Sequence, residues 1–143
     1  MIFVIRADAG VVQGTGHVMR CLSLAEKLLE RGHQVHLLTN ESNVVWLESA
    51  IEGSGVRVSR VEADSIDLET IKGFNPDWLI VDSYQIPAQE ISEVNNSIPV
   101  LAIVDSDSRG IEATLYLDTN LFADKLDWPG DLANRLLAGS KYS

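Results

Sequence analysis

A glycine-rich segment near the N-terminus ends in a histidine. Gly14 and Gly16 precede His17 at the expected start of a helix, and Arg20 follows one helical turn later. The first turn of a helix exposes backbone N–H groups and carries the positive end of the helix dipole, so it suits an anion and lowers the pKa of a histidine. Neutral imidazole is the form that acts as a general base near pH 7. The segment therefore makes His17 a candidate catalytic base.

Two charged residues lie near His17. Arg20 is on nearly the same side of the helix, where it can hold an anion or orient a carboxylate. Asp8, on the other side of the glycine-rich loop, can orient His17 or bind a sugar hydroxyl. Ordinary explanations remain open, with His17 as a partly buried residue at a helix start and Arg20 as a solvated surface charge.

The glycine pattern is not that of a dinucleotide-binding fold. The G-x-G-x-x-G motif needs glycine or alanine where this chain has Met19, and Thr39-Asn40 stands where an acid would bind a ribose. An NAD-dependent enzyme is therefore disfavoured. His33, His36 and Cys21 lack the spacing of a metal site, so we expect neither a metal nor a cofactor.

The hydrophobic pattern predicts alternating strands and helices. Apolar runs of strand length are separated by segments with helical spacing, and Gly32 stands where the first helix should end. This order predicts a Rossmann-like α/β fold, an open parallel sheet with helices on both faces. We expect strands over residues 2–5, 35–39, 56–61, 78–81, 100–104 and 114–117, and helices over 17–31, 41–52, 68–74 and 87–95.

Three of the expected strands end in an acid, at Asp82, Asp105 and Asp118. In an open α/β sheet, ligands bind in the crevice at the carboxyl ends of the strands. The three carboxylates are therefore expected to face one edge of the sheet and to share a site. An aspartate that ends a strand also commonly caps the following turn, and this explanation holds for any one of the three.

Composition limits the classes of function. The 143 residues suit one domain, residues 1–143, and 45% hydrophobic content is enough for a core. A net charge of -10 disfavours a nucleic-acid partner, although a nucleotide needs only local donors. The single cysteine, Cys21, favours a reduced, cytoplasmic compartment. The sequence shows neither a signal peptide nor an apolar run near the roughly 20 residues of a membrane helix.

Several motifs together resemble one family. The sequence is similar to the pseudaminic-acid-pathway UDP-sugar hydrolases and the related spore coat polysaccharide biosynthesis proteins. The similarity covers nearly the whole chain in the order of the family, and its most specific part lies at the N-terminus. The matching segments are Arg6-Ala-Asp8, Gly14–Ala25, Leu79–Tyr84, Val100–Asp105, Leu117–Asn120 and Leu137–Tyr142.

The resemblance implies a two-domain GT-B protein, related to the glycosyltransferase that adds N-acetylglucosamine in peptidoglycan synthesis. It implies that His17 activates a water molecule, which attacks the anomeric carbon of a UDP-linked deoxy-diacetamido sugar with inversion and releases UDP. The substrate-binding residues are then expected at Arg6, Asp8, Gly14, Gly16, Arg20, Tyr84 and Asp105.

Some features depart from the family. Ser83 stands where many members have histidine, and Ser106 stands where many have a second acid. The chain also stops at Ser143, where family members continue, so we expect a C-terminal nucleotide-binding domain outside this chain and no activity for the chain alone. Two other functions stay open: a GT-B glycosyltransferase half, in which an acceptor hydroxyl replaces water, and a non-catalytic Rossmann-like binding module.

Overall fold

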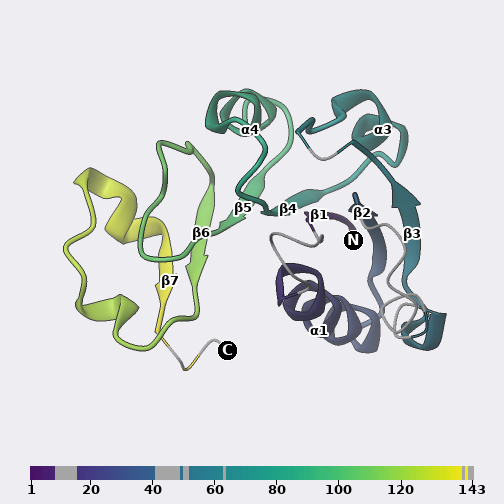
Figure 1. Ribbon diagram of the computed structural model, residues 1–143, viewed down its shortest axis with the longest axis horizontal. Helices are drawn as coiled ribbons and strands as arrows, with labels where there is room; N and C mark the ends of the chain where they lie inside the picture. The colour runs from purple at the N-terminus through teal and green to yellow at the C-terminus, as the bar shows by residue number, and fades with distance from the viewer. Residues whose placement is uncertain (9–15, 41–48, 50–51, 63, 140, 142–143) are drawn as a thin grey trace.

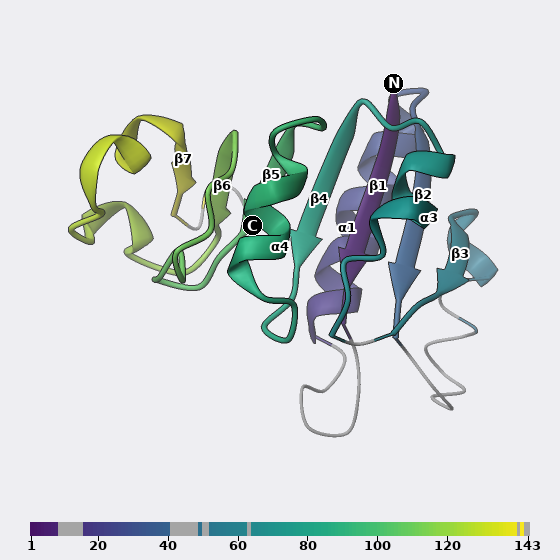
Figure 2. The same cartoon turned by 90° about the horizontal axis from the view of Figure 1, so that it is seen from above.

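The computed structural model describes residues 1–8, 16–40, 49, 52–62, 64–139 and 141, without the side chains of Gly16 and His17. Within this part, seven parallel strands form one sheet in the order β3-β2-β1-β4-β5-β6-β7. Figure 2 shows β4, β1 and β2 side by side with their carboxyl ends at the same edge. The strands are β1 (Ile2–Ala7), β2 (Gln34–Thr39), β3 (Arg57–Arg60), β4 (Trp78–Asp82), β5 (Val100–Ile103), β6 (Leu115–Asp118) and β7 (Leu136–Ala138).

Helices cover both faces of the sheet. Helix α1 lies on one face, whereas α3 and α4 lie on the other (Figure 1). The strand order explains this arrangement, because the chain moves one way from β1 to β2 and the opposite way from β4 to β5. Right-handed crossovers in opposite directions place their helices on opposite faces. The helices are α1 (Gly16–Glu30), α3 (Leu68–Gly73) and α4 (Ala88–Val94), with 3-10 turns η1 (Ala123–Lys125) and η2 (Gly130–Arg135).

Helix α1 forms because one side of it is apolar. Its buried positions recur three and four residues apart, which turns a single stripe toward the sheet. The helix ends at Glu30. Gly32, two residues later, has a φ of 84°, which is favourable for glycine and turns the chain so that the N–H of His33 donates to the carbonyl oxygen of Leu28 at 3.1 Å. The buried positions of the stripe are Val18, Cys21, Leu22 and Ala25.

The central strands are apolar on both sides, as expected of a sheet covered on two faces. Val4 and Ile5 are consecutive in β1 and fully buried, yet they belong to two different core clusters, one on each face. Leu79 and Ile80 in β4 divide in the same way. The two layers of core therefore meet at β1 and β4, which fixes the position of the residues that follow these strands.

The predicted fold class is confirmed, with differences at the margins. The predicted helix over 41–52 falls largely on residues outside the described part. Strand β7 and the two 3-10 turns were not predicted, because each is only three to six residues long and has no clear hydrophobic period. Among the described residues, none of the helices has the length and apolar character needed to cross a membrane.

Candidate functional site

The strand order reverses between β1 and β4. Strands β2 and β3, which follow β1 in the chain, lie on one side of it, and the strands that follow β4 lie on the opposite side. Ligands of open α/β sheets bind at such a switch point, outside the carboxyl ends of the strands. Here the two strands are joined beyond their ladder by the N–H of Asp8, which donates to the carbonyl oxygen of Asp82 at 3.4 Å. Asp105 follows β5 and Asp118 ends β6 at the same edge. The structure thus brings the three predicted strand-end acids to one edge.

Arg20 of α1 joins two of these carboxylates. Its Nε and Nη2 both donate to Asp82, and the Nη2–Oδ1 distance is 2.6 Å. Its Nη1 donates to Oδ1 of Asp105 at 3.2 Å and its Nη2 to Oδ2 at 3.4 Å. The bonds to Asp82, above all, raise the pKa of Arg20 despite its partial burial. Arg20 therefore orients the carboxylates of Asp82 and Asp105, while its side chain is 31% exposed.

Asp105 is an acceptor for three different side chains. Besides Arg20, the hydroxyl of Tyr84 donates to its Oδ2, and Nδ2 of Asn120 donates to its Oδ1 at 3.0 Å. Burial by itself would raise the pKa of Asp105, but the three donors prevail and lower it to about 2. Burial and the bond to Asp105 raise the pKa of Tyr84 to about 12. At neutral pH Asp105 is ionised and Tyr84 protonated, so neither is a general base poised near pH 7.

Asp118 connects the loops that follow β5 and β6. It is completely buried, and its Oδ2 accepts the N–H of Ser106 at 2.6 Å. Its Oδ1 accepts the N–H and the side-chain Nδ2 of Asn120 at 2.9 and 2.7 Å. This carboxylate therefore caps two turns, as the alternative explanation for a strand-end acid proposes, and it also positions Asn120 against Asp105.

Arg6 and Asp8 lie in the interior of the protein, at the carboxyl end of β1. Arg6 is completely buried and its Nη1 contacts Oδ1 of Asp8 at 2.5 Å, while its Nη2 donates to the carbonyl oxygen of Glu62 at 2.7 Å. Asp8, 1% exposed, also accepts the hydroxyl of Ser83, whose oxygen in turn accepts the N–H of Gln85 at 3.1 Å. Both residues are predicted to bind substrate, and this stays a prediction. Their described contacts tie the segments after β3 and β4 to the end of β1.

Cys21 lies in the core next to Asp82, one of the carboxylates that Arg20 binds. Its Sγ is 3.7 Å from Oδ2 of Asp82, and the side chain is fully buried. Burial, with the adjacent charge of Asp82, raises the pKa of the thiol well above its usual range. Cys21 therefore stays protonated at neutral pH and is a core residue, because a nucleophilic cysteine needs a lowered pKa.

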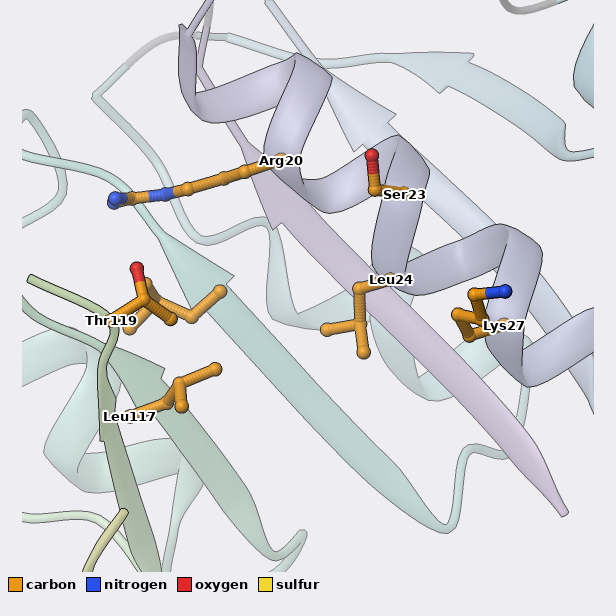
Figure 3. Close-up of a pocket in the computed structure, with 7 residues that line it drawn as sticks. Arg20, Ser23, Leu24, Lys27, Leu117 and Thr119 are labelled. Carbon is orange, nitrogen blue, oxygen red and sulfur yellow. The ribbon is translucent and has the colours of Figure 1, made fainter. Parts of the chain in front are cut away.

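A pocket of about 390 Å³ opens beside the network, on the α1 side of the sheet. In Figure 3, Leu24 and Leu117 line opposite sides of it, and Arg20 extends from α1 across its end toward Thr119. The volume lies within the range of small-molecule sites, which are mostly apolar with a few polar groups. The pocket and the carboxylate network thus share Arg20. The remaining lining residues are Ser23, Lys27 and Ile103.

One residue of the site had no signal in the sequence. Cζ of Arg109 lies 4.5 Å from the centroid of the Tyr84 ring, so the guanidinium covers this half-exposed ring. Arg109 comes from the loop after β5, which has no recognisable motif. Only the approach of this loop to the segment after β4 could have revealed the pair, and that approach depends on the tertiary fold.

The predicted base and its glycines are described only in part. Helix α1 begins at Gly16, which places the backbone of His17 in its first turn, as predicted. The His17 side chain and the whole of Gly14 lie outside the described residues. Among the described residues, no group of three or more histidine, cysteine, aspartate or glutamate side chains is arranged to hold a metal ion.

Comparison with known proteins shows relatives in structure only. No protein-family model matches the sequence, and no curated protein is similar to it. The glycosyltransferase from Rickettsia africae ESF-5 matches 95% of this chain with a TM-score of 0.65 and 15% identity, and the chain covers 41% of it. The glycotransferase of kitacinnamycin matches 96% with a TM-score of 0.60 and 14% identity, and the chain covers 50% of it.

MurG from Acinetobacter baumannii is also similar, with a TM-score of 0.56, 15% identity, 82% of this chain covered and 40% of the MurG chain. At such identities the likeness concerns the fold. The chain spans 40% to 50% of the length of these three proteins. The chain therefore has a Rossmann-like fold that is similar to part of each of these three proteins, in agreement with the predicted α/β fold class.

Proposed function

We propose that the chain is the sugar-side domain of a GT-B enzyme that transfers a glycosyl group from a nucleotide sugar to an acceptor hydroxyl. The observation that carries this proposal is the network of Arg20, Asp82 and Asp105 at the switch point of the sheet. The network lies at the edge where this fold binds ligands, and half-exposed Tyr84 reaches it from the surface. The fold shared with glycosyltransferases supports the same activity.

In this proposal His17 is the general base. Its imidazole takes the proton of the attacking hydroxyl while that oxygen bonds to the anomeric carbon, and the bond from this carbon to the diphosphate oxygen breaks. Asp105 is ionised at neutral pH and is held by Arg20, so it accepts hydrogen bonds and does not take the proton. The helix position of His17 favours the neutral imidazole that the reaction needs.

The nucleotide is bound elsewhere in this proposal. The chain spans 40% to 50% of the length of the glycosyltransferases with which it shares its fold. We propose that a second domain binds the nucleoside diphosphate, while residues 1–143 bind the sugar side and carry the base. Alone, the chain is then expected to bind UDP weakly and to have no turnover.

Hydrolysis of a UDP-linked deoxy-diacetamido sugar is a second candidate. The observation that favours it is the N-terminal segment from Arg6 to Ala25, whose motif resembles that of the UDP-sugar hydrolases. The two reactions differ only in the nucleophile, since water replaces the acceptor hydroxyl. His17 has the same role in both.

An assay of UDP release tests the proposal. The protein in which this chain is joined to its nucleotide-binding domain is incubated with UDP-linked N-acetylhexosamines and deoxy-diacetamido sugars, with and without candidate acceptors. We expect UDP release that depends on an acceptor, and a glycoside as the second product. His17→Ala is expected to lower turnover about 100-fold or more, because a general base contributes roughly this much.

The matched control is His33→Ala, a histidine beyond the other end of α1. It is expected to leave turnover close to that of the unchanged protein. Release of UDP with incorporation of oxygen from labelled water, with no need for an acceptor, identifies the hydrolase instead. Turnover by residues 1–143 alone contradicts the division into two domains, and full activity of His17→Ala contradicts the role of the base.

A further inference from the structure

Arg109 is held in a defined position beside the candidate site. Its backbone is left-handed, with a φ of 53°, which a side-chain-bearing residue adopts only when its surroundings require it. Its N–H donates to Oδ1 of Asp107 at 2.9 Å, and two residues on, the N–H of buried Ile111 donates to the carbonyl oxygen of Ser108 at 3.0 Å. The loop is therefore fixed at both ends of the turn, and Arg109 is directed onto Tyr84.

The guanidinium of Arg109 has N–H donors that are not used in hydrogen bonds to the described residues. One face covers the Tyr84 ring, with Cζ 4.5 Å from the centroid. Within the described part of the chain, the side-chain N–H groups of Arg109 make no hydrogen bond or ion pair. Its Nε is buried without a partner. An arginine has five N–H donors in one plane, and a buried donor without a partner is unfavourable. Stacking on the ring occupies the face of the guanidinium and uses none of these donors.

The nearby carboxylates do not neutralise Arg109. Asp105, which Tyr84 contacts, is already shared by Arg20, Tyr84 and Asn120. Arg20 in turn has two carboxylates, Asp82 and Asp105, so its positive charge is more than balanced. The whole chain carries a formal net charge of -10. An anionic ligand that approaches this edge therefore needs a local cation other than Arg20, and Arg109 supplies it.

We infer that Arg109, stacked on Tyr84, binds an oxyanion of the substrate, a phosphate or a carboxylate. The planar fork of a guanidinium matches the two oxygens of such a group, and stacking on an aromatic ring fixes the orientation of the fork. This inference rests on the proposed function for the identity of the ligand. The oxyanion then belongs either to the diphosphate of the nucleotide sugar or to an acidic sugar that acts as acceptor.

Binding of small anions to the 143-residue chain tests the inference without any need for activity. The chain is titrated with inorganic pyrophosphate, UDP, glucuronate and, as a neutral control, glucose, while NMR follows the Nε–Hε signal of Arg109. We expect at least one of the anions to shift this signal and glucose to leave it unchanged. A shift by pyrophosphate and UDP identifies the diphosphate as the source, and a shift by glucuronate identifies an acidic sugar.

Substitutions sharpen the result. Arg109→Gln is expected to weaken binding of the anion by about tenfold or more, since hydrogen bonds to a charged group are among the strongest in proteins. Arg109→Lys, which keeps the charge and loses the fork, is expected to be intermediate. The matched control is Arg57→Gln, an exposed arginine on β3 at the far end of the sheet, and it should leave binding unchanged.

Two outcomes overturn the inference. One is an unshifted Arg109 signal with all three anions, which needs no variant and so does not depend on whether the variants fold. The other is anion binding of the same strength in the unchanged chain and in Arg109→Gln. Neither outcome touches the proposed glycosyl transfer, which the release of UDP and its dependence on His17 test separately.

Discussion

Arg20 determines the chemistry available in the described part of the site. It binds Asp82 and Asp105 at once, and Asp105 is held ionised with a pKa of about 2. Tyr84, with a pKa of about 12, keeps its proton at neutral pH. These groups are fixed in one protonation state and suit the binding of hydroxyls. Proton transfer near pH 7 needs a group of another kind, which is why the proposed mechanism gives this step to His17.

The substitution Arg20→Gln tests how far the network supports the fold. Asp82 is only 1% exposed, so removal of the guanidinium leaves a buried carboxylate without its main counter-ion. We expect a loss of about 3 kcal/mol in the free energy of unfolding, measured by urea denaturation at pH 7. Arg31→Gln, an exposed arginine just after the same helix, is the control and should change stability by less than about 0.5 kcal/mol. Equal effects of the two substitutions would count against the network.

Sequence reasoning reached some of these residues and missed others for a physical reason. Asp82, Asp105 and Asp118 were found because parallel strands must end at a common edge, which is a property of the fold class. The partners of Arg20 were left open, since side-chain pairing depends on distances between elements. The ion pair between Arg6 and Asp8 inside the protein could not be predicted, because it depends on the burial of both side chains. Arg109 was missed because its loop has no pattern.

At the scale of elements, β5 and β6 are held together beyond their ladder by one carboxylate. Asp118 accepts the N–H of Ser106 after β5 and two donors of Asn120 after β6. Asn120 is thereby directed at Asp105, and Ser106 begins the loop that carries Arg109. The elements around the site are thus aligned by a residue that is itself completely buried.

Asp118→Asn is expected to loosen this connection. An amide has one oxygen in place of two, so at least one of the three partly buried hydrogen bonds to this side chain is lost. We expect a loss of about 1 to 3 kcal/mol in the free energy of unfolding, together with shifted NMR signals for Ser106 and Asn120. The control is Asp127→Asn, an exposed residue between η1 and η2, which should leave both quantities unchanged. Unchanged signals in Asp118→Asn would contradict the bridging role.

Elements with continuous apolar runs were predicted well, and short ones were not. Strands β1 and β4 are recognisable because residues on both faces are buried, so that the sequence shows an unbroken apolar run. Strand β7 has three residues, and η1 has three as well. Such elements are defined by the neighbours they pair with or pack against. Local sequence carries little information about them.

For the molecule as a whole, the sheet has a stable centre and weaker edges. The central strands β1 and β4 are buried and paired on both sides, whereas β3 at one edge is mostly exposed and β7 at the other is short. Amide hydrogen exchange measured by NMR should therefore be slowest in β1 and β4 and markedly faster in β3 and β7. Protection of β3 or β7 equal to that of β4 would contradict this gradient.

The switch point lies at the centre of this gradient, and that location has a consequence for ligand binding. Arg20 is on α1 and Asp82 ends β4. If amide hydrogen exchange follows the expected gradient, these elements open only when the whole domain unfolds. An edge strand can fray, or be trimmed by a protease, without moving the residues of the proposed ligand site. The part of the sheet that opens first is thus separate from the part whose geometry the proposed reaction requires.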